Sequence, residues 1–248
     1  LIPPTHGELA SGLSGEGRLP EPHEIVDFIE KHYTKNLPLE GKKVLISAGP
    51  TIEQLDPVRY ISNHSSGKMG YSLAETALSL GAEVKLISGP TNQSIPSENI
   101  KIVHIKTGNE LLEAIRNDYN NSDIVIMAAA VSDYKPIEFS EKKIKKDNNE
   151  LNIKFEKTTD ILFELGQNKK NQILVGFALE NNNELSNAIN KLEKKNLDLI
   201  VLNSLNDEGA GFGYDTNKIT VVDCSGNVTP YKLKKKNEVA DDVFKHII

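Results

Sequence analysis

Small and polar residues follow the first apolar strand predicted in this chain, in the segment AGPTIEQLDPVRYISNHSSGKMG at 48–70. Gly67 and Gly70 flank a predicted helix start, where small residues let backbone amides approach a phosphate and the helix dipole favours an anion. A tight turn with a helix cap is the alternative, but the segment holds more polar side chains than a turn needs. The spacing matches neither GxxxxGK[ST] nor GxGxxG. The candidate contacts are Gly49, Thr51, Ser66 and Gly67.

A second candidate surface follows another predicted strand and reads Ala128, Ala129, Ala130, Val131, Ser132 and Asp133. The alanines leave room for a flat ligand against the backbone, and the aspartate could accept a hydrogen bond from an amino or hydroxyl group. Close packing of a helix over the alanines is an equally weighted alternative. Phe177 ends a further predicted strand, where its ring could stack on a base or pack in the core.

Lysines occur at spacings that suit an anionic ligand. The run KKIKK occupies 142–146, and on a strand Lys143 and Lys145 would face the same side. Lys191 and Lys195 are four residues apart and share one flank of a predicted helix. For both groups the alternative is a solvated surface, which is the commoner role of clustered lysines. The functional interpretation is that cations from separate segments reach a triphosphate.

The overall charge of the chain limits the other classes of function. Its 248 residues include 29 basic and 35 acidic side chains, a net charge of −6, which argues against general binding to nucleic acid or membrane surfaces. No apolar run approaches the roughly 18–20 residues that cross a bilayer. The histidines lack metal-ligand spacing, and no GxSxG or HExxH motif is present. The single Cys224 can form no internal disulfide, which favours a reducing, cytoplasmic setting.

The candidate residues depend on the elements of an α/β fold. Continuous apolar strands alternate with amphipathic helices, a pattern typical of a mainly parallel, Rossmann-like sheet with helices on both faces. Ligands bind at the carboxyl ends of the strands in such sheets. Strands are predicted at 43–47, 83–88, 100–105, 123–128, 173–177 and 197–202, and helices at 24–31, 73–80, 109–117 and 182–195.

Three segments depart from this alternation. Residues 1–22 are rich in Gly, Pro and Ser without an apolar period, and they predict a loop or linker. Residues 132–168 hold the KKIKK run and the alternating stretch LNIKFE, and they predict a strand-containing lid excursion beside the sheet. Near the C-terminus, 218–223 and 228–233 flank Ser-Gly-Asn, which predicts a hairpin.

Several ordered motifs make the chain resemble a known family. The segments are SAGPTIEQLDPVRYISNHSSGKMG, AAAVSDY, KKIKK, TTDIL, VGFALE and KKNLDLIVLN, in this order across 47–203. They resemble the phosphopantothenoylcysteine synthetase half of bacterial bifunctional coenzyme A biosynthesis proteins. The resemblance implies a ligase in which 4′-phosphopantothenate attacks the α-phosphate of CTP and releases pyrophosphate. The amine of L-cysteine then displaces CMP from the acyl-cytidylate.

The same resemblance implies roles for individual residues. Asn63 would hold the acyl-cytidylate, Lys143 would stabilise charge at the α-phosphate, and Arg59 would order the phosphopantothenate end. The choice of CTP over ATP follows from the bacterial fused type and from no spacing in the sequence. The implied CTP site comprises Ala128, Ala129, Ala130, Asp133, Thr159, Asp160, Ile161, Leu162, Phe177, Lys191 and Lys195.

Cofactors and partners are also implied by the resemblance. Mg²⁺ would bridge the phosphates without a dedicated protein ligand, and the family suggests a homodimer whose lid covers the site from its own or the neighbouring subunit. The tail LASGLSGEGRLPEP resembles the end of a fused FMN-dependent decarboxylase, which makes 1–22 its remnant and 23–248 the ligase domain. Ser11 stands at the position of a catalytic cysteine in relatives, a departure that argues against decarboxylation by this chain.

Two other functions fit a sheet of this kind. An NAD(P)-dependent reductase would need a helical YxxxK pair, whereas Tyr214 with Lys218 and Tyr231 with Lys235 fall in predicted loop or strand. A non-catalytic nucleotide-binding module would bind CTP without releasing pyrophosphate. Both alternatives are therefore distinguishable from a ligase by assay.

Overall fold

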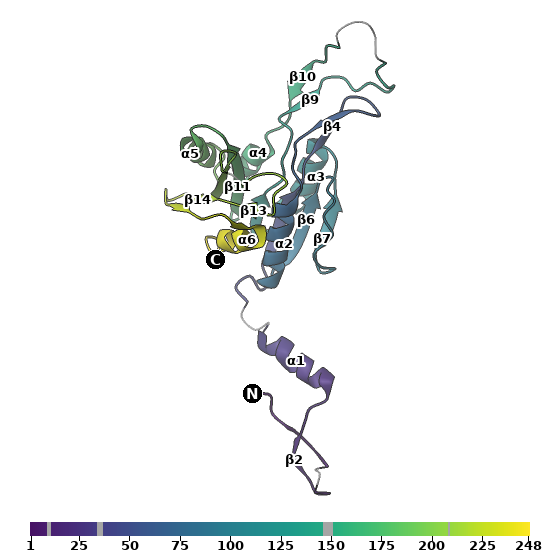
Figure 1. Cartoon of the computed structure of the whole chain (residues 1–248), viewed down its shortest axis with the longest axis vertical. Helices are drawn as coiled ribbons and strands as arrows, with labels where there is room; N and C mark the ends of the chain where they lie inside the picture. The colour runs from purple at the N-terminus through teal and green to yellow at the C-terminus, as the bar shows by residue number, and fades with distance from the viewer. Residues whose placement is uncertain (9–10, 34–36, 146–150, 208) are drawn as a thin grey trace.

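The computed structural model describes residues 1–8, 11–33, 37–145, 151–207 and 209–248. Within these ranges the centre of the fold is an eight-stranded sheet in the order β15-β14-β12-β11-β8-β3-β6-β7 (Figure 1). Its strands are β3 (Lys43–Ala48), β6 (Glu83–Ser88), β7 (Lys101–His104), β8 (Ile124–Met127), β11 (Ile173–Glu180), β12 (Leu199–Ser204), β14 (Thr220–Asp223) and β15 (Val228–Pro230).

Neighbouring strands pair in parallel from β7 across to β12, whereas β14 and β15 add an antiparallel hairpin at the other edge. The chain passes from β3 to β6 and β7 on one side, and then to β8, β11 and β12 on the other. The direction of winding therefore reverses between β3 and β8, which opens a crevice at their carboxyl ends. The predicted Rossmann-like fold and the C-terminal hairpin are confirmed.

Helices cover both faces of this sheet. One face carries α2 (Lys68–Ser79) and α6 (Lys236–Phe244), and the other carries α3 (Gly108–Tyr119), α4 (Ile161–Gln167) and α5 (Glu184–Lys194). Side chains alternate along each strand, so that Ile46 packs in the core under α2 and α6, whereas Leu45 packs in the core under α3 to α5. Double coverage explains why these strands are continuously apolar.

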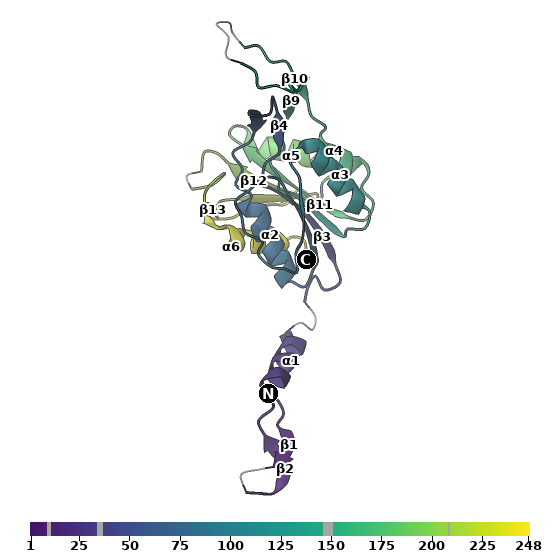
Figure 2. The same cartoon turned by 90° about the vertical axis from the view of Figure 1, so that its right-hand side faces the viewer.

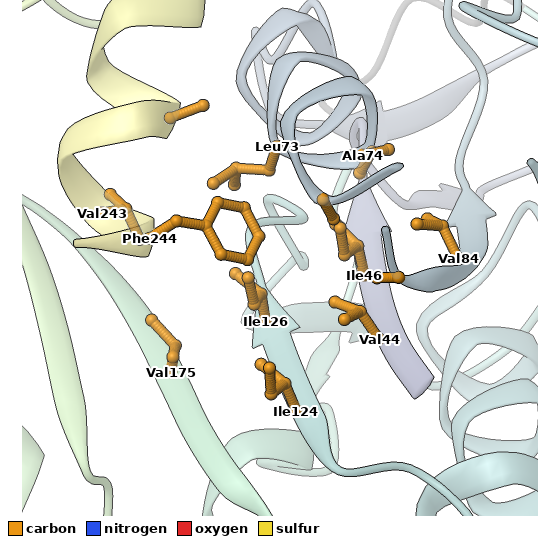
Figure 3. Packing of buried hydrophobic residues seen from close by; sticks show 14 of the residues in the cluster. Val44, Ile46, Leu73, Ala74, Val84, Ile124, Ile126, Val175, Val243 and Phe244 are labelled. Carbon is orange, nitrogen blue, oxygen red and sulfur yellow. The ribbon is translucent and has the colours of Figure 1, made fainter. Parts of the chain in front are cut away.

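The core under α2 and α6 is closed by an aromatic ring. Figure 3 shows Phe244 of α6 pointing toward Leu73 of α2 and Ile126 of β8. Phe244 is 1% exposed, although α6 was absent from the predicted helices because charged residues interrupt its short apolar pattern. Packing against the sheet therefore decides this helix more than its own sequence pattern.

An arm projects from the carboxyl side of the sheet (Figure 1). It consists of β9 (Tyr134–Pro136) paired antiparallel with β10 (Phe155–Lys157) and lies beside the hairpin of β4 (Ile52–Gln54) and β5 (Tyr60–Ser62). The predicted strand-containing excursion is confirmed, but it is shorter than 132–168. The chain returns to the sheet in α4, which the sequence did not predict.

The N-terminal segment lies at the end of the molecule opposite the arm (Figure 2). The prediction of a loop over residues 1–22 is wrong, because β1 (Thr5–Glu8) and β2 (Ser14–Arg18) form an antiparallel hairpin. Its strands are rich in glycine and charge and lack a buried face, which is why no strand pattern is visible in the sequence. The predicted helix is confirmed as α1 (Pro22–Tyr33).

Two further features complete the described fold. The short strands β13 (Thr216–Asn217) and β16 (Lys234–Lys235) pair antiparallel next to the start of α6. In the part of the chain that the structure describes, no helix has the length and apolar character needed to cross a bilayer.

The packing of Phe244 gives a stability prediction. Phe244→Ala should lower the free energy of unfolding by about 3–5 kcal/mol, because a large cavity replaces a buried ring. Denaturant unfolding followed by circular dichroism measures this change. Phe163→Ala on α4 is the matched control, since that ring is 37% exposed, and equal losses in both variants would contradict the role of Phe244 in the core.

Candidate active site

A cavity of about 670 Å³ lies at the carboxyl edge of the sheet, beside the reversal between β3 and β8. Its wall comes from the loop before α2, the end of β8, the loop before α4, and parts of β11, α5 and α6. The charged groups of this wall, among the described residues, are Lys68, Lys157, Lys191, Lys195, Lys236, Asp133 and Asp160. Ammonium groups outnumber carboxylates in a chain whose net charge is −6, so the cavity favours an anionic ligand.

The cavity brings together most of the residues predicted to bind ligand. Those in its wall are Asn63, Ser66, Gly67, Ala128, Ala129, Ala130, Asp133, Thr159, Asp160, Ile161, Leu162, Phe177, Lys191 and Lys195. They come from the loop before α2, the residues after β8, the loop before α4, the strand β11 and the end of α5, and the fold brings these separate segments to one cavity. Their shared location is a structural finding, whereas the role of each stays a prediction.

Two glycines allow α2 to start at the cavity. Gly67 has a φ of 79°, a left-handed conformation that favours glycine. A Cβ atom on Gly70 would lie 2.5 Å from the Cβ atom of Ala48 and 3.1 Å from the carbonyl oxygen of Ser47. The first N–H groups of a helix have no intrahelical acceptor, so this close approach presents donors to an anion in the cavity.

Asn63 is held against the end of β8. Its Nδ2 atom donates to the carbonyl oxygens of Ala130 at 3.1 Å and Val131 at 3.0 Å. Thr51 is fully buried, and its Oγ1 atom accepts from the backbone N–H of Ser132 at 2.9 Å. These bonds join the two loops, and among the described residues no donor occupies Oδ1 of Asn63, which leaves an oriented acceptor at the cavity.

Lys191 and Lys195 reach the cavity from the end of α5, as their spacing predicts. The Nζ atom of Lys195 lies 2.7 Å from Oδ1 of Asp160, and that of Lys191 lies 3.7 Å from Oε1 of Glu180. Both lysines line the same cavity as the half-buried ring of Phe177. This end of the cavity therefore combines an aromatic surface with two oriented cations.

The cavity wall does not include every predicted site residue; outside it lie Gly49, Thr51, Arg59 and Lys143. The first two support the wall, since the carbonyl oxygen of Gly49 accepts from Ala130 N–H at 2.8 Å. Arg59 lies at the base of the arm, and Lys143 is an exposed residue of the arm itself. Lys143 therefore does not line the cavity that contains Asn63.

The KKIKK run has no regular secondary structure at 142–145. The expectation that Lys143 and Lys145 share one side of a strand is therefore wrong, because the pairing of β9 with β10 does not extend to the run. Lys146 lies outside the described residues. The segment is positioned instead by bonds to the turn between β4 and β5.

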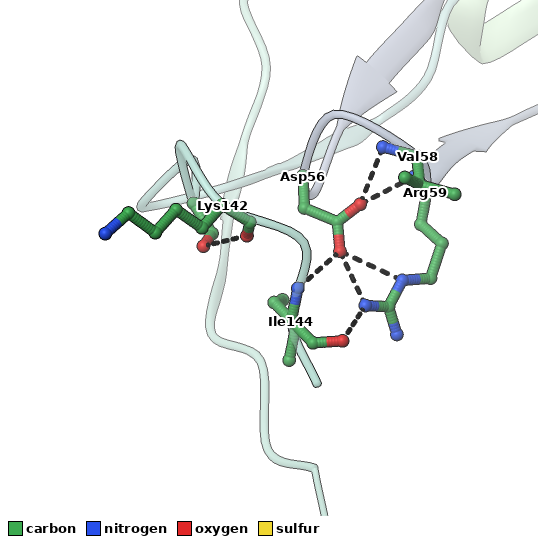
Figure 4. A network of polar contacts seen from close by, with 6 residues as sticks. Asp56, Val58, Arg59, Lys142 and Ile144 are labelled. Atoms are coloured by element: carbon green, nitrogen blue, oxygen red, sulfur yellow. Dashed lines mark hydrogen bonds and ion pairs between the residues drawn. The ribbon is translucent and has the colours of Figure 1, made fainter. Parts of the chain in front are cut away.

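Those bonds converge on the buried carboxylate of Asp56 (Figure 4). Oδ1 accepts from the backbone N–H groups of Val58 and Arg59, both at 2.8 Å. Oδ2 accepts from Nε of Arg59 at 2.9 Å and from the N–H of Ile144 at 3.1 Å, and Arg59 also donates to the carbonyl oxygen of Ile144. Asp56 thus links Arg59 to the segment that carries Lys143.

The pKa of Asp56 reflects these bonds. Burial alone would raise it, but the N–H groups of Val58, Ile144 and Arg59, together with the Arg59 guanidinium, lower it from 3.8 to about 2. Because the folded-state pKa is the lower one, the stabilisation by this carboxylate is complete above pH 3.8 and is lost as the pH falls toward 2.

The Asp56 contacts predict how firmly the arm is held. Asp56→Asn should speed hydrogen exchange at the Ile144 amide by about tenfold or more, because the amide NH₂ group repels the donors that the carboxylate accepts. Exchange measured by NMR at neutral pH tests this prediction. Asp118→Asn, which breaks an ion pair with Lys85 elsewhere, is the control, and an unchanged rate at Ile144 in the Asp56 variant would refute the link.

Several wall residues were not predicted to bind ligand, chiefly Lys68, Lys157, Asn203, Asn217 and Lys236. Lys68 lies between Gly67 and Gly70 in the sequence, and this position next to the predicted phosphate contacts could have identified it as a ligand-binding residue. Lys236 lies in the C-terminal stretch KKKNEV, where three consecutive lysines gave no reason to choose one. Only the packing of α6 shows that Lys236 is the buried member.

Residues 39–248 match the family described as the DNA/pantothenate metabolism flavoprotein C-terminal domain. The chain belongs to this family. The matched range contains the whole central sheet, the arm and every wall residue of the cavity.

Curated relatives of this chain include a bifunctional coenzyme A biosynthesis protein and a protein named as a decarboxylase. A coenzyme A biosynthesis bifunctional protein CoaBC of Bacillus subtilis (strain 168) is 45% identical over 249 residues, which are 100% of this chain and 61% of that protein. A protein of an unknown prokaryotic organism, named Cysteine/Cysteine sulfinic acid decarboxylase, is 50% identical over 253 residues, or 100% of this chain and 70% of that protein. The chain therefore spans less than two thirds of the CoaBC relative.

Solved structures share the fold. The C-terminal domain of a CoaBC protein is 41% identical with a TM-score of 0.73, covering 86% of this chain and 96% of that domain. A Cab2 mutant in complex with phosphopantothenate-cysteine is 20% identical with a TM-score of 0.68, covering 92% and 95% of the two chains. The predicted resemblance to the synthetase half of bifunctional coenzyme A biosynthesis proteins is confirmed at the level of the family.

Proposed function

We propose that this chain joins 4′-phosphopantothenate to L-cysteine in a CTP-dependent step of coenzyme A biosynthesis. The observation that carries the proposal is the lysine-rich cavity at the β3–β8 reversal in a member of this family. Both 4′-phosphopantothenate and CTP are anions, and a reaction between them needs cations that offset their repulsion.

The first proposed step activates the carboxylate. A carboxylate oxygen of 4′-phosphopantothenate bonds to the α-phosphorus of CTP, and the bond from that phosphorus to pyrophosphate breaks. Lys191 and Lys195 would hold the phosphates beside Phe177, on which the base would stack. Lys143 would stabilise the charge that develops at the α-phosphate.

The second proposed step forms the amide bond. The amine of cysteine attacks the carbonyl carbon of the acyl-cytidylate, CMP leaves with the bonding electron pair, and the amine loses a proton to water. An acyl phosphate is already electrophilic, so positioning matters more than a strong base. Oδ1 of Asn63, oriented by the bonds of Nδ2, would accept a hydrogen bond from the intermediate.

A homodimer would bring Lys143 to the cavity of the neighbouring subunit. The arm exposes large apolar side chains that a second copy could cover: Tyr134, Ile137, Phe139, Leu151 and Phe155. Exposed apolar groups concentrated on one projecting element mark an interaction surface. Arg59 at the base of the arm would then lie near the same phosphopantothenate.

The proposal includes Mg²⁺ held mainly by the phosphates of CTP. In the described part of the chain, no three His, Cys, Asp or Glu side chains are grouped to hold a metal, and the wall carboxylates Asp133 and Asp160 are the nearest candidates for outer contacts. FMN would belong to a fused decarboxylase domain in the full polypeptide. The hairpin of β1 and β2 lies at the end of the molecule opposite the arm (Figure 2) and takes no part in the proposed reaction.

The two alternative functions are less well supported. For a reductase, Tyr214 with Lys218 and Tyr231 with Lys235 lie outside helices, so neither forms the helical pair that hydride transfer would use. A non-catalytic module is less well supported because the chain belongs to a family whose curated relatives include coenzyme A biosynthesis proteins. Pyrophosphate release from CTP that depends on 4′-phosphopantothenate would support the ligase and exclude both alternatives.

The role of Lys143 gives an activity prediction. Lys143→Gln should lower pyrophosphate release by about 100-fold or more, because it removes a charge aimed at the α-phosphate. A coupled assay with CTP and 4′-phosphopantothenate measures the rate. The neighbouring exposed Lys142→Gln is the matched control, and near-normal release by the Lys143 variant would discard the assignment.

Supply of Lys143 by the partner subunit can be tested by mixing variants. Lys143→Gln and Asn63→Asp should each be impaired alone, but mixed dimers restore one site that holds both native residues. Refolding the two variants together in equal amounts should recover about a quarter of the native rate of amide product formation. Random pairing makes about half of the dimers mixed, and each mixed dimer has one intact site of two. No recovery, with dimers present by light scattering, would mean that Lys143 acts within its own chain.

A further inference from the structure

The cavity has two positive ends on opposite faces of the sheet. Lys191 and Lys195 enter from the side of α5, whereas Lys68 and Lys236 enter from the side of α2 and α6. The strand end at Ala128–Ala130 lies between the two faces. The proposed reaction places the nucleotide at the first end. The second end includes the start of α2, where the sequence predicts a phosphate, but the proposed reaction does not say which phosphate binds there.

Lys236 is the most buried lysine of this second end. It is the first residue of α6 and is 6% exposed. Its Nζ atom donates to the carbonyl oxygen of Gly211 at 3.2 Å and also to that of Tyr214. It forms no ion pair with a carboxylate in the described chain, whereas Lys68 lies 2.6 Å from Oδ1 of Asp215.

The charge of Lys236 is therefore poorly compensated in the free protein. Burial, followed by repulsion from Lys68 on α2, lowers its pKa from 10.5 to about 8, and the attraction of Asp215 opposes this shift only in part. An anion in the cavity would supply the missing negative charge and favour the protonated form. The first turn of α2 adds N–H donors at the same end.

We propose that Lys236 anchors the phosphate group of 4′-phosphopantothenate at the α2–α6 end of the cavity. The inference rests on the proposed function, because it assigns one end of a site that must hold two anions. The phosphate and the reacting carboxylate lie at opposite ends of 4′-phosphopantothenate. A phosphate at Lys236 lets the carboxylate extend past Asn63 toward a nucleotide held by Lys191 and Lys195.

Binding of phosphorylated and unphosphorylated ligand separates this role from a structural one. Calorimetry without CTP compares 4′-phosphopantothenate with pantothenate, which lacks the phosphate. Lys236→Met should weaken 4′-phosphopantothenate by about tenfold or more, as for a lost hydrogen bond between charged groups, and should change pantothenate little. Lys235→Met is the matched control, since this neighbour is exposed and outside the wall of the main cavity.

A second variant keeps a positive charge at position 236 and tests whether that charge is what binds the phosphate. Lys236→Arg should keep the preference for the phosphorylated ligand. In the native protein, affinity for 4′-phosphopantothenate should fall as the pH rises above about 8, because the free protein then loses the proton that the bound state needs. The arginine variant should lack this fall, since the phosphate is already a dianion at these pH values.

The outcomes distinguish the anchor from the overall reaction. Equal loss of affinity for both ligands in Lys236→Met would show a structural role and overturn the phosphate assignment, as would an unchanged affinity for 4′-phosphopantothenate. Native protein that releases no pyrophosphate from CTP would overturn the proposed function. Even if the native protein releases no pyrophosphate, tighter binding of 4′-phosphopantothenate than of pantothenate that depends on Lys236 would still show an anion site.

Discussion

The mutual repulsion of lysine side chains is the constraint on which this site depends. Five ammonium groups line one cavity in the described chain, and they would separate if they stood on one flexible segment. The fold brings them from different elements and restrains several with carboxylates, as Asp160 does for Lys195 and Asp215 for Lys68. The resulting positive cavity is oriented before a ligand arrives, which lowers the cost of binding polyanions.

Backbone geometry makes this concentration of charge useful. The start of α2 reaches the cavity only because Gly70 leaves no Cβ atom against Ala48. Asn63 and Thr51 then bind the α2 loop to the end of β8 through Ala130 and Ser132. Helix donors, a fixed amide oxygen and the ammonium groups therefore surround one space, and a change at any of these supports would alter the geometry offered to the reacting groups.

The arm has a different design from the rest of the site. It carries Lys143, which does not line the cavity of its own chain, and Asp56 holds its inner segment through Arg59 and Ile144. A carboxylate with a pKa of about 2 keeps these contacts ionised at all physiological pH values. The arm is thus tied at its base while its apolar side chains stay exposed, an arrangement that fits completion of the site by a second subunit.

Periodicity in the sequence alone determined the Rossmann-like sheet, and the ordered motifs contained most of the predicted site residues that line the cavity, because strand alternation and loop chemistry are local properties. The β1–β2 hairpin and the helices α4 and α6 were not predicted. Their sequence patterns are short or polar, and strand pairing and packing decide these elements. Only the tertiary structure showed that Lys236 lines the main cavity whereas Lys235 does not. It also showed that Lys143 does not line the cavity that contains Asn63. Burial and distance depend on which elements meet in space, and no spacing along the chain contains that information.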